Sequence, residues 1–159
     1  SDEATKLAEA LPSALAAFDE GNYSVAQDTI VPLAGNRFCN PEDMSAMREK
    51  VAPAKELFQT AFAAEKFSNA HAAYIIATAV EPDGDEFVAK AKATCGEMAF
   101  VAEKLMFEQK LLAEAVPAYR LAVVGKPADL ELRDKLKDAI EALDSEANAA
   151  ERAAAEAAV

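Results

Sequence analysis

Apolar residues recur at helical spacing along most of the chain, and prolines and glycines separate the segments in which they do so. The pattern predicts a first helix over 4–20, whose apolar stripe is Leu7, Leu11, Leu15 and Phe18. After the turn at Gly21-Asn22, a second helix to residue 34 is predicted, with Ser24 as its cap. The run Asn40-Pro41-Glu42-Asp43 predicts the start of a third helix, which we expect to reach residue 65 with a bend at Pro53.

The second half of the chain continues the same pattern. We predict a helix capped by Ser68 that ends before Glu81-Pro82-Asp83-Gly84, a long helix over 85–110, and a shorter one to residue 124. The long helix has a seam with spacings of three and four residues, made of Val88, Ala91, Cys95, Met98, Ala102 and Leu105. A last helix is predicted from about residue 128, and beyond Leu143 we expect an exposed and frayed tail. No segment alternates as a strand does, so the predicted fold class is all-α.

Composition agrees with a helical chain and excludes several classes of partner. Alanine, the strongest helix former, supplies 39 of the 159 residues. The formal net charge is −12, which excludes generic binding to nucleic acid or to an anionic membrane surface. No apolar run approaches the roughly 20 residues of a membrane span, and we predict none.

The residues that usually carry chemistry are scarce. With two cysteines and one histidine, His71, the chain cannot supply the four ligands of a structural zinc site, and no phosphate loop or nucleophile motif is present. We therefore predict no metal, no cofactor and no enzymatic activity. Cys39 and Cys95 are expected to be free thiols, because the predicted helix register separates them along the axis by far more than a disulfide spans. The start at Ser1, without Met, slightly favours an exported mature protein over a cytoplasmic one.

One spacing pattern occurs three times. It reads Tyr23-x-x-Ala26-x-x-x-Ile30, then Phe67-x-x-Ala70-x-x-x-Tyr74, then Leu112-x-x-Ala115-x-x-x-Tyr119, with a small or large apolar residue three positions later. The small residue allows two antiparallel helices to approach closely, and the large one fills the space towards the next pair. Pro82 and Pro127 follow the second and third copies at the same distance.

This pattern resembles the second half of the tetratricopeptide repeat, although the copies lie 44 and 45 residues apart instead of 34. The resemblance implies a single domain over 1–159: a right-handed array of three antiparallel helix pairs, at about 4–38, 41–82 and 85–127, and a C-terminal capping helix at about 128–158. The turn glycine of the family stands at Gly21 but is replaced by Glu65 and Lys110. Glu103 occupies a position at which the family prefers a small residue.

In this family the first helix of each pair lines a concave groove. The groove positions correspond here to Leu11, Leu15, Phe18, Lys55, Gln59, Phe62, Phe100, Lys104 and Phe107. Phe18, Phe62 and Phe107 form a recurring aromatic position that either faces a peptide with apolar anchors or packs in the core. Leucines at the first unit's positions make a carboxylate clamp, as in tetratricopeptide co-chaperones, unlikely to form.

The sequence therefore predicts a non-catalytic interaction module or assembly scaffold that binds a protein or peptide on its concave face. One alternative is a structural bundle that forms a homo-oligomer through its C-terminal helix. Another is a carrier of a small molecule or lipid. An enclosed apolar cavity would favour the carrier, and the size in solution would identify the oligomer. Residues 128–159 carry nine acidic and four basic side chains, which a solvated end cap explains most simply.

Overall fold

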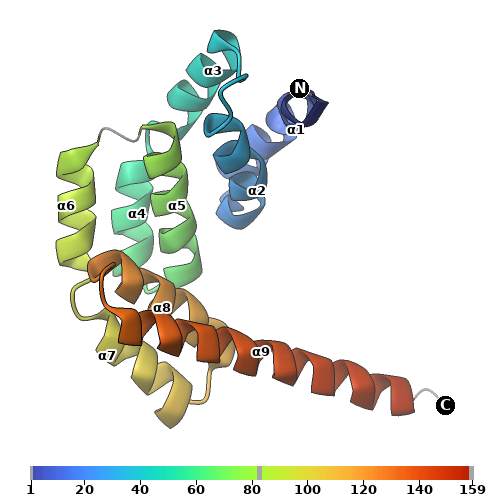
Figure 1. Ribbon diagram of the computed structural model, residues 1–159, viewed down its shortest axis with the longest axis vertical. Coiled ribbons are helices and arrows are strands. Elements are labelled where there is room, and N and C mark those ends of the chain that lie inside the picture. The colour runs from blue at the N-terminus through green and yellow to red at the C-terminus, as the bar shows by residue number, and fades with distance from the viewer. Residues whose placement is uncertain (1, 82–83, 158–159) are drawn as a thin grey trace. The chain divides into compact units, whose positions relative to one another are not determined.

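The computed structural model describes residues 2–81 and 84–157, and every regular element within these ranges is helical (Figure 1). The chain divides into two compact units, residues 1–90 and 91–159, and the single domain over 1–159 stays a prediction. The boundary falls within the helix α6 (Asp85–Thr94), inside the third predicted helix pair. We describe each unit by itself.

The first unit contains α1 (Asp2–Asp19), α2 (Tyr23–Ala34), α3 (Pro41–Val51), α4 (Ala54–Ala63) and α5 (Phe67–Val80). In this unit α1 packs against α2, α4 against α5, and α2 against α5. Its core gathers apolar side chains from all five helices, including Leu11, Phe18, Ile30, Met47 and Ile76.

Local sequence signals explain most of the helix ends. Asn40 caps α3, since its side-chain oxygen accepts a hydrogen bond from the Asp43 amide at 2.7 Å. The predicted long helix over 41–65 is divided into α3 and α4 at Pro53, which has no amide hydrogen to continue the backbone ladder. The predicted caps Ser24 and Ser68 are wrong, because α2 and α5 each begin one residue earlier. The predicted stop before Glu81 is confirmed, whereas Pro82 lies outside the described residues.

The second unit contains α7 (Met98–Glu103), a π-helical turn η1 (Lys104–Glu108), α8 (Leu112–Gly125) and α9 (Leu130–Ala157). The predicted helix over 85–110 is interrupted at residues 95–97, next to Gly96, and ends in the π turn. Five of the six seam residues are nevertheless buried: Ala91, Cys95, Met98, Ala102 and Leu105. The helix α8 packs against both α7 and α9.

The helix α9 covers α8 with its first half only. Leu132 and Ala139 are buried against the unit, and all described residues after Leu143 are exposed. The tail is exposed, as predicted, but the expectation of fraying is wrong: α9 remains helical to Ala157 and extends beyond α7 and α8 (Figure 1). Alanine, the strongest helix former, supplies most of the uncharged residues there and supports a helix without tertiary packing.

The backbone repeats in the register that the three alanines predicted. Gly21, Glu65 and Lys110 all have positive φ, at 84°, 59° and 55°, and they lie 44 and 45 residues apart. In the first two turns, the amides of Asn22 and Lys66 donate to carbonyls five residues earlier, at 2.8 and 2.9 Å, which is the Schellman arrangement that ends a helix.

In the third turn, the amide of Leu111 donates six residues back, to the Leu105 carbonyl at 2.8 Å. The π turn η1 therefore holds the one extra residue that makes the second interval 45 instead of 44.

Candidate functional site

The structure divides the nine residues predicted to face a partner into three groups. Leu11 and Phe18 are each 4% exposed and lie in the core of the first unit, so they are not available to a partner, contrary to the prediction. Leu15 is half-buried against the same core. The physical reason is that α1 has one apolar stripe, which packs against α2 and α3 and cannot also line an open groove.

The second group, Lys55, Gln59 and Phe62, lies on α4. Lys55 and Gln59 line an open groove of about 760 Å³ whose other wall is the segment 84–87 and Lys90, at the start of α6. Phe62 is half-buried and does not line the groove. Its ring lies 6.0 Å from Phe58 and 5.9 Å from Phe67, between centroids.

Phe87 forms the aromatic part of the groove wall, and the sequence analysis missed it. Its ring centroid lies 5.8 Å from that of Phe58 and 5.8 Å from that of Tyr74, so the wall continues into a cluster of rings behind α4. Burial of these rings fixes the position of Phe87 against α4. The sequence signal for Phe87 was an aromatic residue three positions after Gly84, in the first turn of a predicted helix. The sequence does not show which helix this ring packs against, because that depends on the tertiary fold.

The ammonium group of Lys55 is paired with a carboxylate within the first unit. Its Nζ lies 2.9 Å from Glu81 Oε2 and 5.8 Å from the centroid of the Phe87 ring. A Cβ built on Gly84 would lie 3.5 Å from this Nζ, so the ammonium packs directly against the backbone before α6. Lys55 therefore connects α4 to Glu81 and to the segment 84–87, and it is not a free cation for a ligand.

The third group, Phe100, Lys104 and Phe107, forms an exposed face of α7 and η1 in the second unit. Phe100 is 71% exposed and Phe107 is 67% exposed. Lys104 is also exposed, and its Nζ lies 6.0 Å from the centroid of the Phe100 ring. The three residues lie within eight consecutive positions of this one helical segment. We call these three residues the aromatic face.

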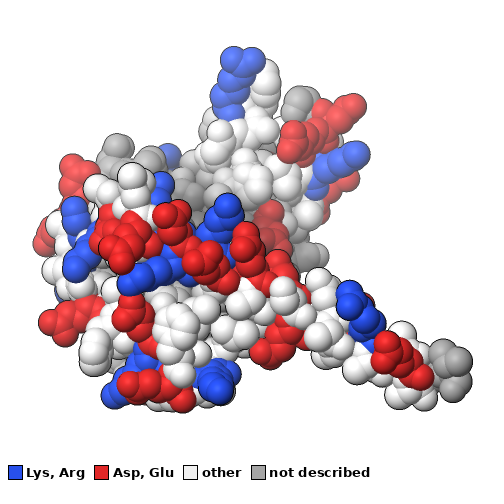
Figure 2. All heavy atoms as spheres, turned by 60° about the horizontal axis from the view of Figure 1, so that its bottom comes forward, with Lys and Arg blue, Asp and Glu red and all other residues white. Residues whose placement is uncertain are grey.

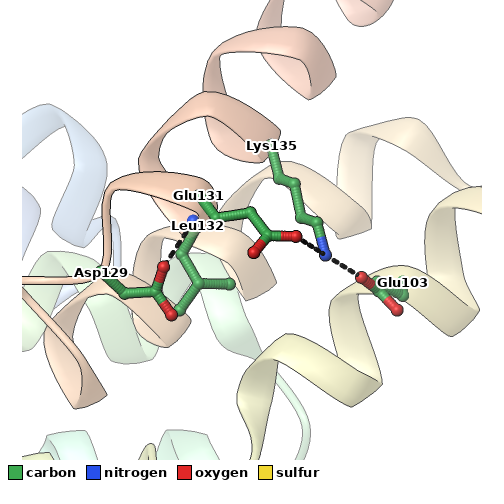
Figure 3. A network of polar contacts seen from close by, with 5 residues as sticks. All are labelled: Glu103, Asp129, Glu131, Leu132 and Lys135. Carbon is green, nitrogen blue, oxygen red and sulfur yellow. Dashed lines mark hydrogen bonds and ion pairs between the residues drawn. The ribbon is translucent and has the colours of Figure 1, made fainter.

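A polar network joins the capping helix to the segment behind the aromatic face (Figure 3). Lys135 Nζ of α9 donates to Glu103 Oε1 at 2.5 Å and lies 3.6 Å from Glu131 Oε1. The hydrogen bond to Glu103 is the main cause that raises the pKa of Lys135. The Asp129 carboxylate accepts from the Leu132 amide at 3.2 Å and so caps the start of α9. Glu103, which departs from the repeat pattern, thus pairs with the capping helix.

The remaining candidates for chemistry are metal-ligating side chains and the two cysteines. Within the described ranges, no three His, Cys, Asp or Glu side chains are grouped closely enough to hold a metal ion. Cys39 and Cys95 are free thiols, as predicted, and burial raises the pKa of Cys95 to about 12. No helix in the described part of the chain has both the length and the apolar character needed to cross a bilayer.

A second hollow, of about 420 Å³, lies between the start of α1 and the loop before α3, and it includes Phe38 and Cys39. Both hollows are open to solvent, which does not favour a carrier that encloses an apolar ligand. Comparison of the chain with protein-family models, with curated proteins and with solved structures found no match.

Proposed function

We propose that this chain is a non-catalytic, tetratricopeptide-like interaction module. It binds a peptide or a partner protein through the aromatic face, which lies on the first helix of the third predicted pair. The observation that carries the proposal is the aromatic face, on which Phe100 and Phe107 are each at least two-thirds exposed. Exposed large apolar side chains on one short segment are typical of protein-binding surfaces, because exposing them to water is unfavourable until a partner covers them.

Comparison of the repeated phenylalanines supports this assignment. Phe18 lies 5.1 Å from the Tyr23 ring and Phe62 lies 5.9 Å from the Phe67 ring, between centroids, so each leans on the aromatic residue that opens the next helix. The third copy has Leu112, which carries no ring, at that position, and Phe107 is 67% exposed. The third repeat copy therefore exposes its phenylalanine, whereas the first two copies pack theirs against a neighbouring aromatic ring.

The proposed partner segment contributes apolar side chains to the two phenylalanines. Phe100 and Phe107 are seven residues apart, which corresponds to about 10 Å along a helix. That distance suits an amphipathic helix with apolar residues two turns apart, or an extended segment with apolar residues three positions apart.

Selection of a random peptide library, displayed on phage, against the immobilised full chain tests the proposal. Peptides recovered with the wild-type protein should bind Phe100→Ser/Phe107→Ser at least about tenfold more weakly. Phe38→Ser is the matched control, because Phe38 is 59% exposed but lies in a loop of the first unit. All variants should keep the wild-type circular dichroism, since surface substitutions change stability by about 0.5 kcal/mol or less. Equal binding to the double variant and to wild type would refute the proposal.

A second candidate function, self-association through α9, follows from the exposed half of that helix. The described residues after Leu143 are all exposed, and alanines at 147, 150, 154 and 157 continue the apolar stripe of α9. Figure 2 shows acidic and basic side chains interspersed along α9, with uncharged surface between them. Sedimentation equilibrium distinguishes the two functions: a dimer that truncation after Leu143 converts to a monomer would support self-association.

A further inference from the structure

The groove between α4 and α6 has features of a second binding surface, separate from the aromatic face. It is about 760 Å³ in volume and open along one side, so an extended segment can enter it. Phe87 gives it an apolar wall that is supported from behind by Phe58 and Tyr74. A wall that is held in place by packed rings offers a fixed surface for the aliphatic part of a ligand.

The charges around the groove are predominantly negative once internal pairs are counted. Lys55 is neutralised by Glu81 at 2.9 Å. Glu56, Asp85 and Glu86 line the groove and are exposed, and no ion pair joins them to a cation within the described part of the chain. Lys90 is the one other basic residue in the described lining.

We propose that this groove binds a cationic, extended peptide segment in which Arg or Lys residues alternate with apolar ones. The cationic heads would lie beside Glu56 and Glu86, while an apolar side chain and the aliphatic stems would lie against Phe87. This assignment goes beyond the proposed function, because it concerns a different surface and states the charge of its ligand. It also agrees with the net charge of −12, which attracts cationic partners over distance.

Fluorescence anisotropy with labelled peptides tests this assignment on the full chain. One probe alternates Arg with Leu, and the other has Glu in place of every Arg. The Arg–Leu probe should bind, with an affinity that falls as salt is raised, and the Glu–Leu probe should not. Equal binding of the two probes would overturn the proposal, and so would complete displacement of the Arg–Leu probe by spermidine, since a small polyamine would then be the better ligand.

Two sets of variants locate the binding. Glu56→Gln/Glu86→Gln should raise the Kd of the Arg–Leu probe about five- to tenfold. Glu20→Gln/Glu49→Gln removes the same charge from exposed positions outside the groove and should change the Kd less than about twofold. If the two pairs of substitutions weaken binding equally, the effect is due to net charge and the groove is not the site.

Gln59→Leu provides an independent check that does not depend on charge. The side-chain nitrogen of Gln59 is buried without a hydrogen-bond partner in the structure, so an apolar side chain of similar size should not destabilise the fold. Because Gln59 lines the groove and its side-chain oxygen is not among the buried unpaired atoms, the same change should weaken the Arg–Leu probe about three- to tenfold through the lost hydrogen bond from the peptide backbone to this oxygen. Unchanged affinity for the probe would overturn the assignment. Phe100→Ser/Phe107→Ser should not affect this probe, so the two proposals can fail separately.

Discussion

Replacing Gly125 by Ala would place a methyl group where α8 meets the turn after α6. A Cβ built on Gly125 lies 2.5 Å from the carbonyl oxygen of Cys95, 2.8 Å from its carbonyl carbon and 3.2 Å from its Cβ. Gly125 is buried, and the two shortest contacts are with backbone, which cannot rotate away as a side chain can. Overpacking of this kind costs about 1–3 kcal/mol, and contact with backbone places Gly125→Ala near the upper end, at about 3 kcal/mol.

Urea denaturation followed by circular dichroism measures this loss, and thermal unfolding should show a fall in Tm of about 6–12 °C. Gly35→Ala is the matched control, because Gly35 has an α-helical φ of −82° and its Cβ would lie 3.6 Å from the nearest atom. This control should be stabilised by about 0.4–1 kcal/mol, since Ala restricts the unfolded chain more than Gly does.

A double variant separates the backbone clash from side-chain crowding. Cys95→Ala keeps the carbonyl group and Cβ that contact the new methyl group, so it should not rescue Gly125→Ala. Wild-type stability of Gly125→Ala, or rescue by Cys95→Ala, would show that α8 does not end against the Cys95 backbone.

Four further predictions concern individual side chains. Glu65→Gly should raise the free energy of unfolding by about 1 kcal/mol, because Glu65 has a φ of 59° that is costly for a residue with a Cβ; Ala64→Gly, at a φ of −83°, should lower it in the same urea titration. Tyr119→Phe should be neutral or stabilising by up to about 1 kcal/mol in thermal melts, since the buried hydroxyl has no hydrogen-bond partner in the structure, and a loss above 1 kcal/mol would contradict this. In native protein a thiol reagent should modify the half-buried Cys39 and spare the buried Cys95, and two thiols should react after denaturation. Burial raises the pKa of Cys95 to about 12, above its ordinary 9.0, so the folded state favours the neutral thiol. The contribution of this thiol to the free energy of unfolding is complete below about pH 9 and is lost as the pH rises towards 12. Cys95→Ala should remove this pH dependence.

The sequence alone determined the helical class, most helix ends and the repeat register. These features depend on local chemistry. Asn40 and Pro41 start a helix through hydrogen bonding and a fixed φ, Pro53 interrupts the ladder, and apolar spacing identifies the buried seam of α6 and α7. The register marked by Ala26, Ala70 and Ala115 reappears as three fully buried alanines and three turns with positive φ.

Tertiary structure decided which apolar residues remain exposed. Phe18, Phe62 and Phe107 occupy the same position in the repeat, yet the first is buried, the second is half-buried and the third is exposed. Sequence spacing cannot separate these three cases. Burial of each phenylalanine depends on the residue that opens the next helix, and in the third copy also on the π turn η1. That turn is revealed only by the hydrogen bond from the Leu111 amide to the Leu105 carbonyl.

The groove between α4 and α6 could likewise be predicted from the sequence only in part. Lys55 and Gln59 could be assigned to it from their place in the repeat, but Phe87 and the carboxylates of α6 come from a segment that follows a separate turn. Periodicity reports which side of a helix is apolar, because it depends on neighbours three and four residues away. The opposite wall of a groove is set by packing between segments distant in sequence, and that information is present only in the folded chain.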